Sequence, residues 1–179
     1  MQIDKNMGNS RRGTPFTFVL RDILQFDKTK EDAINRMNTT DRTCSIFVGV
    51  GDSTSDQMDI VEYSYESLTP YNSTSYPTYT AHPYIEDVIY VDKHVQPSSD
   101  PCLGNVLNEG WGNIDAKYLF QQAAARLQTG DMHVAVYDYL NQFMYVSNAQ
   151  IYVSGQPQLM AYERPYVRLN MSAIFNEEL

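Results

Sequence analysis

The chain has 179 residues, of which 42% are hydrophobic, and its formal net charge is -9. This length and apolar content are sufficient for a domain with its own core and exclude a disordered tail. The negative charge argues against a nucleic-acid partner, which would call for a basic surface. Because no apolar run approaches the ~20 residues of a membrane-spanning helix, we expect no transmembrane segment.

The first part of the chain carries two helical patterns after a polar start. We expect residues 1–13 to form a flexible N-terminal segment. Apolar residues then recur at helical spacing through residues 14–26, which predicts an amphipathic helix. Thr29 is a candidate N-cap for a second helix, because Asp32 follows three residues later in its first turn.

The middle of the chain alternates between strand patterns and loops. Residues 44–52 form an apolar, β-branched run that predicts a strand, and residues 58–68 predict its antiparallel neighbour. Residues 69–83 are rich in Ser, Thr, Tyr and Pro, which indicates a surface excursion. We expect a short strand at residues 86–92 and a loop at residues 95–105.

The clearest helical pattern lies between residues 111 and 131. Asn113 or Asp115 is expected to cap its start, and Gly130 is expected to end it. A hairpin follows, with a turn at residues 138–142 and a second strand that finishes at Asn148.

A last strand, predicted at residues 164–171, precedes a short helical tail. Helices and strands neither alternate strictly nor give an all-β pattern. We therefore predict an α+β fold, with a single domain at residues 14–179, a mainly antiparallel sheet and helices packed on one face.

Common cofactor and metal signatures are absent from the sequence. It contains no P-loop, no G-x-G-x-x-G and no C-x-x-C, so we expect no cofactor. The three histidines, His82, His94 and His133, are scattered. A zinc site would need all of them to converge, so we favour the absence of a metal.

Two cysteines leave two interpretations open. Cys44 and Cys102 either form a disulfide or are both buried thiols. A cysteine that opens a strand, as Cys44 does, is one way to present a nucleophile. We favour the plainer interpretation of Cys44 as a buried strand residue.

Three glycosylation sequons begin at Asn38, Asn72 and Asn170 and favour the secretory route. The polar N-terminus, however, has no apolar signal region. Either the sequons are unused in an intracellular protein, or Met1 is an internal methionine and the true leader lies upstream.

Asn148, Arg164 and Arg168 are the candidate site residues. A strand-terminal asparagine often caps a turn, and this interpretation remains open. Alternatively, a side-chain amide on a rigid strand can stabilise an oxyanion, with a downstream arginine beside it. Arg164 and Arg168 would share a strand face if their stretch were regular.

Several segments together resemble one enzyme family. GTPFTFVLRDILQFDKTKEDAINRM is similar to the helix pair of the isopenicillin N acyltransferase group, which includes penicillin V acylases, bile-salt hydrolases and acid ceramidase. TGDMHVAVYDYLNQFMYVSNA resembles the late hairpin of that group, which ends at an asparagine, and ERPYVRLNM resembles the arginine-bearing strand that follows. The resemblance spans roughly residues 8–179, is weak between 69 and 110, and is strongest to acid-ceramidase-like members.

This resemblance implies an N-terminal-nucleophile hydrolase with an αββα sandwich. In such enzymes a self-cleaved precursor exposes a cysteine that attacks the amide of an N-acyl small molecule or lipid amide. By position, Asn148 would be the oxyanion donor and Arg164 the site arginine, with Arg168 as its alternative.

One departure from the family limits this expectation. The family's nucleophilic cysteine lies upstream of the helix pair, where this chain has none, and Cys44 lies downstream of that pair. The chain therefore resembles the C-terminal part of an enzyme whose nucleophile-bearing strands are missing. We expect it to be inactive alone, and either poorly soluble or paired with the missing N-terminal chain of the same precursor.

Three functional hypotheses follow from the sequence. The first is part of a lysosomal or secreted N-acyl amide hydrolase or acyltransferase. The second is a degenerate binding or structural module of the same fold, in which the tyrosines of residues 63–90 form a contact surface. A third, remote reading makes Cys44 an active thiol.

Overall fold

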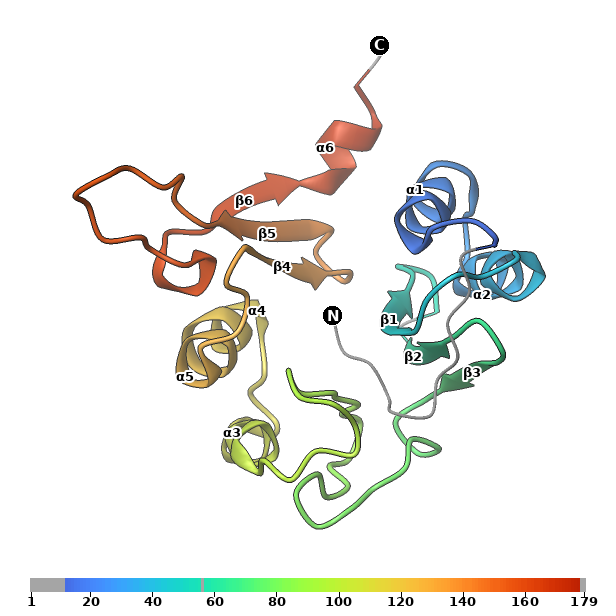
Figure 1. Ribbon diagram of the computed structural model, residues 1–179, viewed down its shortest axis with the longest axis horizontal. Coiled ribbons are helices and arrows are strands. Elements are labelled where there is room, and N and C mark those ends of the chain that lie inside the picture. The colour runs from blue at the N-terminus through green and yellow to red at the C-terminus, as the bar shows by residue number, and fades with distance from the viewer. Residues whose placement is uncertain (1–11, 56, 178–179) are drawn as a thin grey trace. The chain divides into compact units, whose positions relative to one another are not determined.

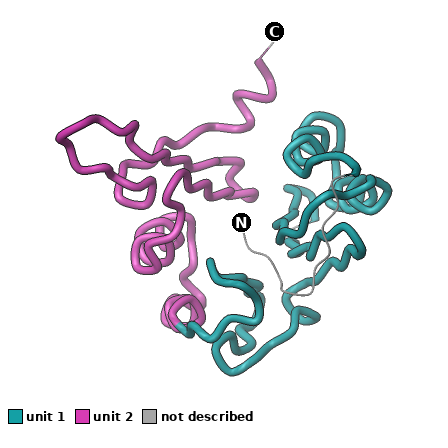
Figure 2. Tube along the Cα trace, viewed as in Figure 1, with its two compact units in different colours: residues 1–101 teal, residues 102–179 magenta. Residues whose placement is uncertain are grey.

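The computed structural model describes residues 12–55 and 57–177 (Figure 1). Residues 1–11, which hold most of the predicted N-terminal segment, lie outside the described residues. The chain divides into two compact units, residues 1–101 and 102–179 (Figure 2). The single domain expected at residues 14–179 stays a prediction. Helices and antiparallel sheets occur in both units, which confirms the α+β class.

The first unit begins with the predicted helix pair, α1 (Phe16–Phe26) and α2 (Lys30–Thr39). Thr29 caps α2 as expected: its hydroxyl accepts a hydrogen bond from the Asp32 backbone amide at 3.1 Å. Asp32 returns the contact by accepting from the Thr29 amide at 3.3 Å. This reciprocal capping box satisfies two backbone donors that the first turn would leave unpaired.

A three-stranded antiparallel sheet packs its apolar face on these helices (Figure 1). Its strands, in spatial order, are β1 (Ile46–Gly51), β2 (Met58–Tyr63) and β3 (Leu68–Tyr71). Alternate strand residues join the helix residues in one core. Its buried members are Val19, Ala33, Met37, Ile46, Val48, Val50, Val61 and Tyr63.

Three expectations for the middle of the chain are wrong. Residues 68–71 form edge strand β3, where Pro70 is tolerated because an edge strand needs fewer backbone donors. Residues 86–92 form no strand, since Asp87 adopts a left-handed backbone with φ 57°. The loop expected at residues 95–105 instead gives way to helix α3 (Cys102–Gly110).

A single helical segment follows α3 in the second unit. It runs through α4 (Ala116–Tyr118), a π-helical stretch η1 (Leu119–Ala124) and α5 (Ala125–Leu127). Of the two expected caps, Asp115 is the one used, and its carboxylate accepts from the Tyr118 amide at 2.7 Å. The helix ends at Gln128, which takes the left-handed conformation with φ 49°.

The predicted hairpin and last strand form the second antiparallel sheet. Its order is β4 (His133–Asp138), β5 (Phe143–Asn148) and β6 (Val167–Asn170), and α6 (Met171–Phe175) follows. The Asp138 carboxylate accepts from the Asn141 amide at 3.0 Å and shapes the turn between β4 and β5. Helical segment η1 covers one face of this sheet, where Phe120 packs on Tyr145 with ring centroids 5.6 Å apart.

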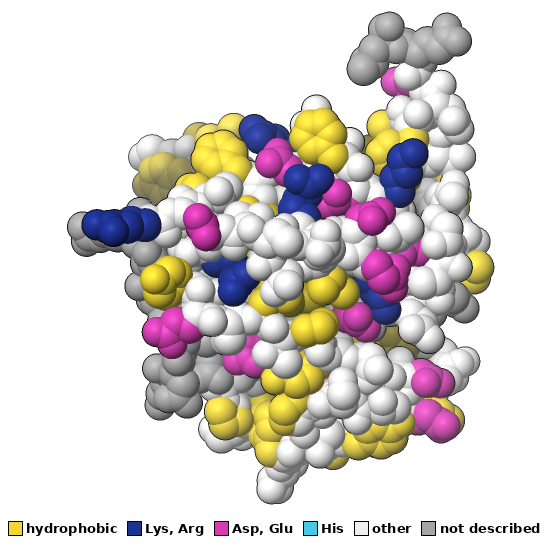
Figure 3. Space-filling model, turned by 90° about the vertical axis from the view of Figure 1, so that its right-hand side faces the viewer, with side chains coloured by type: hydrophobic (Ala, Val, Ile, Leu, Met, Phe, Trp, Pro, Cys, Tyr) yellow, Lys and Arg dark blue, Asp and Glu magenta, His cyan; other side chains and the backbone are white. Residues whose placement is uncertain are grey.

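None of the helices in the described part of the chain has the length and apolar character needed to cross a bilayer. On the face shown in Figure 3, Lys and Arg side chains are dispersed among Asp and Glu rather than gathered into a stripe. That distribution is in line with the expected lack of a nucleic-acid partner, which stays a prediction.

Candidate functional site

Asn148 is the last residue of β5, opposite His133 of β4, and is exposed. Its neighbours on both sides anchor the strand end. The buried hydroxyl of Ser147 donates to the Ala161 carbonyl at 2.7 Å, and the Ala149 amide donates to the Met132 carbonyl at 2.8 Å. Hydrogen bonds of Ser147 and Ala149 therefore fix the backbone on both sides of Asn148, which carries the side-chain amide.

The structure brings Arg164 to the same strand end. Arg164 follows the short 3-10 helix η2 (Ala161–Glu163). Its Nη1 atom donates to the Asn148 backbone carbonyl at 2.6 Å. Because this hydrogen bond is made to the backbone carbonyl and not to the Asn148 side chain, the arginine holds the backbone that carries the side-chain amide.

Arg168 lies elsewhere, because the stretch from 164 to 168 is not a regular strand: β6 begins only at Val167. In register, Arg168 is opposite Tyr145, which is three residues before Asn148 and therefore on the other face of β5. The guanidinium of Arg168 lies 4.7 Å from the ring centroid of Phe143 on that face. Arg164, not Arg168, is thus the arginine that meets Asn148.

The face that carries Asn148 is apolar and partly exposed. Strand register places apolar side chains of all three strands on it: Ala135, Tyr137, Met144, Val146, Val167 and Leu169. Tyr137 is 52% exposed and Val167 is 61% exposed, and Val167 lies opposite Val146, two residues before Asn148, so solvent reaches apolar surface near that strand end. An exposed patch of this kind usually marks a binding surface or an interface.

Cys44 lies just before β1 and packs against the core of the first unit. Within the described residues it is a free thiol. Burial raises the pKa of the Cys44 thiol, although hydrogen bonds with Thr43 and Phe16 act in the opposite direction. A thiol with a raised pKa is a poor nucleophile near neutral pH, which favours the buried-residue interpretation.

We predict slow alkylation of Cys44 in the folded chain. In a Cys102→Ala background, labelling by iodoacetamide at pH 7 should be slower than that of glutathione. It should rise with pH through and above the ordinary thiol range, because a raised pKa leaves less thiolate at any lower pH. The measurement is the labelling rate by mass spectrometry, with Cys44→Ala as the blank. Labelling at pH 7 faster than that of glutathione would restore the reading of Cys44 as an active thiol.

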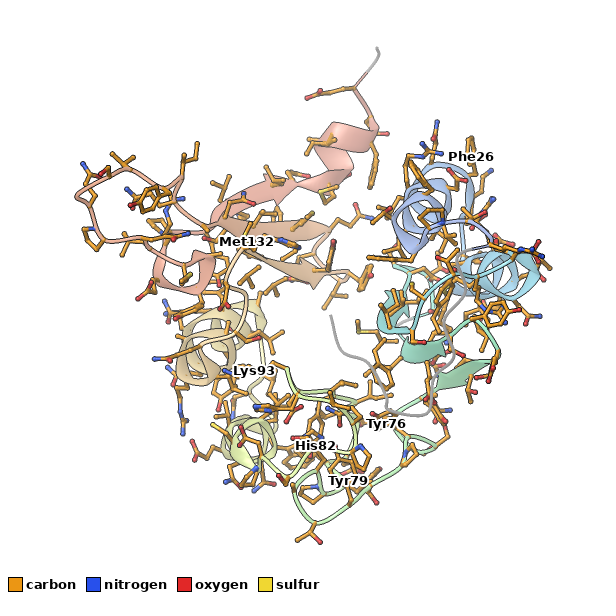
Figure 4. The ribbon with its side chains drawn as sticks, viewed as in Figure 1. Phe26, Tyr76, Tyr79, His82, Lys93 and Met132 are labelled. Atoms are coloured by element: carbon orange, nitrogen blue, oxygen red, sulfur yellow. The ribbon has the colours of Figure 1, made fainter. Side chains whose placement is uncertain are left out.

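A second polar cluster occupies the loop after β3, where His82 and Tyr79 stack with ring centroids 4.7 Å apart (Figure 4). Asp92 is its centre and is only 3% exposed. The carboxylate accepts from Gln96 Nε2 at 2.7 Å and from Ser98 Oγ at 2.5 Å. Sequence reasoning missed this cluster, although polar residues at alternate positions 92, 94, 96 and 98 give a recognisable signal.

The cluster borders a shallow pocket of ≈ 260 Å³, open solvent included, lined by Tyr76, Tyr84, Tyr90 and His82 among others. Both ring nitrogens of His82 already have partners, Tyr79 and Asp92, so neither is offered to the pocket. Both oxygens of Asp92 accept hydrogen bonds. The carboxylate is therefore a structural acceptor, and we assign no metal to this cluster.

The structure therefore defines an α+β chain with antiparallel sheets. At the end of one of its strands, an arginine contacts an asparagine. The chain is similar to protein dcd1A of Dictyostelium discoideum, with 42% identity over 182 residues, covering 96% of this chain and 41% of that protein. It is also similar to protein dcd1B of the same organism, with 37% identity over 182 residues, covering 94% of this chain and 36% of that protein. The chain thus spans well under half the length of the curated relatives it matches. No family model matches the sequence, and no solved structure matches it.

Proposed function

We propose that this chain is the part of an N-terminal-nucleophile amide hydrolase that carries the oxyanion donor. The observation that carries the proposal is the 2.6 Å hydrogen bond from Arg164 to the Asn148 carbonyl, which joins two residues 16 positions apart. The family resemblance assigns roles to these same two residues. An αββα sandwich is part of the proposal, supported by two sheets that each carry helices on one face.

The chemistry assigned to the site is amide cleavage. A cysteine nucleophile from outside these 179 residues attacks the amide carbonyl, and the Asn148 side-chain N–H donates to the developing oxyanion. Arg164 is a positioning residue, because it acts on the backbone of Asn148. The chain alone lacks this nucleophile and is proposed to be inactive, and its partner is the nucleophile-bearing part of the same precursor.

The substrate class is an N-acyl compound, including lipid amides. The open face beside Asn148 supports this choice, since Val146 and Val167 offer apolar surface next to the oxyanion donor. An acyl chain gains free energy by leaving water on such a surface, whereas a polar peptide would not. The proposed location is lysosomal or secreted, supported by sequon asparagines Asn38, Asn72 and Asn170, which are all exposed.

We predict that the two arginines differ in their effect on activity. In the full protein that contains this chain, Arg164→Gln should lower turnover of a fluorogenic long-chain N-acyl amide by roughly ten- to a hundredfold, the loss expected for a hydrogen bond from a charged group. Arg168→Gln is the matched control and should stay within about threefold, because its guanidinium lies on the other face.

Two outcomes would overturn the proposal. One is a full protein, purified with its processed cysteine, that hydrolyses no N-acyl amide. The other is an Arg164→Gln protein that keeps normal turnover while Arg168→Gln loses it. Arg164→Lys restores a cationic donor at this position. Higher turnover in Arg164→Lys than in Arg164→Gln would separate a positioning role from a general loss of folding.

A non-catalytic binding module is the second candidate, favoured by the tyrosine-lined pocket at residues 73–90. Tyrosine supplies a rigid, amphipathic contact surface of the kind found at interfaces. The coding sequence before Met1 separates the two candidates. A cysteine at the start of a strand there, followed by arginine and aspartate, supports the hydrolase, whereas a stop codon directly upstream supports the binding module.

A further inference from the structure

The three glycosylation sequons of the chain lie in three different local structures. Asn38 lies within helix α2, Asn170 ends strand β6, and Asn72 directly follows strand β3 (Figure 1). All three asparagines are exposed, so exposure does not distinguish them. A sequon pairs an asparagine amide with a hydroxyl two residues later, and the modifying enzyme must meet both groups together. The distinction therefore depends on where each segment places that hydroxyl.

At Asn72 the sequon amide and the sequon hydroxyl meet. Thr74 Oγ1 donates to Asn72 Oδ1 at 2.9 Å. The backbone amides of Thr74 and Ser75 donate to the same oxygen at 3.1 Å and 2.9 Å. The Ser75 hydroxyl accepts from the Asn72 backbone amide at 3.0 Å. The result is an exposed turn that holds the two groups side by side.

These contacts also fix which atom of the Asn72 side chain is left free. A backbone amide can only donate, so the end of the side chain that meets the amides of Thr74 and Ser75 is the oxygen. Nδ2, the atom that carries the sugar in a glycosylated asparagine, is at the other end. No hydrogen bond within the described residues occupies this nitrogen. The turn thus holds the oxygen and leaves the acceptor nitrogen accessible.

The turn at Asn72 is built from local contacts alone. All of its hydrogen bonds join residues 72–76, including the one from the Tyr76 backbone amide to the Asn72 carbonyl at 3.1 Å. A turn of this kind needs no partner from a distant part of the fold. It can therefore form early, while the remaining chain is still unfolded and sequons are open to modification.

The sequon at Asn38 does not offer this arrangement. Asn38 lies within α2, and residues two positions apart on a helix do not face each other. The Thr40 hydroxyl donates instead to the Arg36 carbonyl at 2.7 Å. The capping box of α2 is also a local signal, so the helix forms in competition with the modification.

The sequon at Asn170 is also committed to other contacts. Asn170 Oδ1 accepts from the Ala173 backbone amide at 3.0 Å and caps α6. Ser172, which carries the sequon hydroxyl, lies inside that helix. The backbone amide of Met171, the residue between them, donates to the Gln142 carbonyl at 2.9 Å. The Asn170 oxygen therefore serves the helix, and the sequon is tied to the turn between β4 and β5.

We infer that Asn72 is the asparagine of this chain that carries an N-linked glycan, and that Asn38 and Asn170 stay unmodified. The sugar donor is an oligosaccharide on a polyprenyl diphosphate. Nδ2 of Asn72 forms a bond to the anomeric carbon, the bond from that carbon to the diphosphate oxygen breaks, and the diphosphate leaves with the electron pair. Nδ2 gives up one proton to a base of the transferase. The inference rests on the proposed secretory or lysosomal location.

Glycopeptide mass spectrometry tests this inference on the full protein, produced in a eukaryotic secretory host. Enzymatic removal of N-glycans in heavy-oxygen water converts each occupied asparagine into a labelled aspartate. The label is expected at Asn72 and at neither Asn38 nor Asn170. By intact mass, Asn72→Gln should lose one glycan, whereas Asn38→Gln and Asn170→Gln should lose none.

Two serine variants separate the turn from the sequon itself. Ser75→Ala keeps the sequon but removes the hydroxyl that accepts from the Asn72 backbone amide. The occupied fraction of Asn72 should therefore fall, by up to about fivefold for the loss of one hydrogen bond. Ser73→Ala is the matched control, because the Ser73 side chain makes no hydrogen bond within the described turn, and it should leave the occupied fraction unchanged.

Three results would overturn the inference: a label at Asn38 or Asn170, three unlabelled asparagines, or equal occupied fractions in Ser75→Ala and Ser73→Ala. Failure of the proposed amidase gives a different result. A protein with a glycan at Asn72 that hydrolyses no N-acyl amide would remove the amidase and leave this inference standing. A protein that hydrolyses such an amide without a glycan at Asn72 would do the reverse.

Discussion

Replacing Asn148 by alanine in the full protein is expected to lower turnover of an N-acyl amide by on the order of 10²–10³, the loss seen when one oxyanion donor is removed. The side-chain N–H acts on charge that develops during the reaction, so KM should change little. Folding should survive, because Arg164 holds residue 148 through its backbone carbonyl, which alanine retains. The measurement is steady-state kinetics beside a thermal melt.

Asn148→Asp sharpens this experiment. Aspartate keeps the size of the side chain but offers an acceptor where the oxyanion needs a donor, so its loss of turnover should equal or exceed that of alanine. A merely structural role for Asn148 predicts the opposite pattern, in which the variants melt at a lower temperature but keep their turnover. Normal turnover in both variants, with unchanged melting, would remove Asn148 from the site.

Met37→Ala should destabilise the first unit by ~2–5 kcal/mol. Met37 is completely buried in the core that α1 and α2 share with β1 and β2. Truncation removes its contacts and leaves a cavity that the two helices and the sheet fill only in part. Against a typical total of about 5–15 kcal/mol, this loss is large enough to populate the unfolded unit. Hydrogen exchange of the β1 and β2 amides measures it.

Leu24→Ala is the control for that change. Leu24 lies on α1 in the same unit but is 80% exposed, so its truncation should stay within about 0.5 kcal/mol. If the two variants lost the same free energy, the buried core described for this unit would be wrong. A loss for Met37→Ala of under about 1 kcal/mol would also contradict it.

Elements with local signals could be predicted from the sequence. The capping pair Thr29 and Asp32 marked the start of α2, and alternation through residues 133–148 marked the hairpin. Both signals act over a few residues, so they need no knowledge of the remaining fold. The same holds for Asp115, where the sequence left a choice between two caps that only the observed hydrogen bond decides.

Features that depend on distant partners could not be predicted. Pro70 made the segment of β3 resemble a loop in the sequence, although this segment is a strand because β2 pairs with it. Gly104 weakened the helical signal of α3. The contact of Arg164 with Asn148 depends on a loop of irregular backbone, closed by the hydrogen bond from Ser147 to Ala161. Likewise, His82 and Asp92 lie ten residues apart and meet only because Tyr79, Gln96 and Ser98 also converge.

The π-helical stretch Leu119–Ala124 affects how related sequences should be aligned with this one. A π turn accommodates one residue more than an α turn, so an insertion is absorbed inside the helix and not in a loop. A relative that lacks this residue would continue as a plain α-helix with its later side chains in the same phase, whereas an extra residue without the π turn would rotate them by about 100° around the axis. An alignment gap for such a relative therefore belongs within residues 119–124, where it keeps Leu127 matched with the residue that fills its place in the core, and a gap in a neighbouring loop would lose that match.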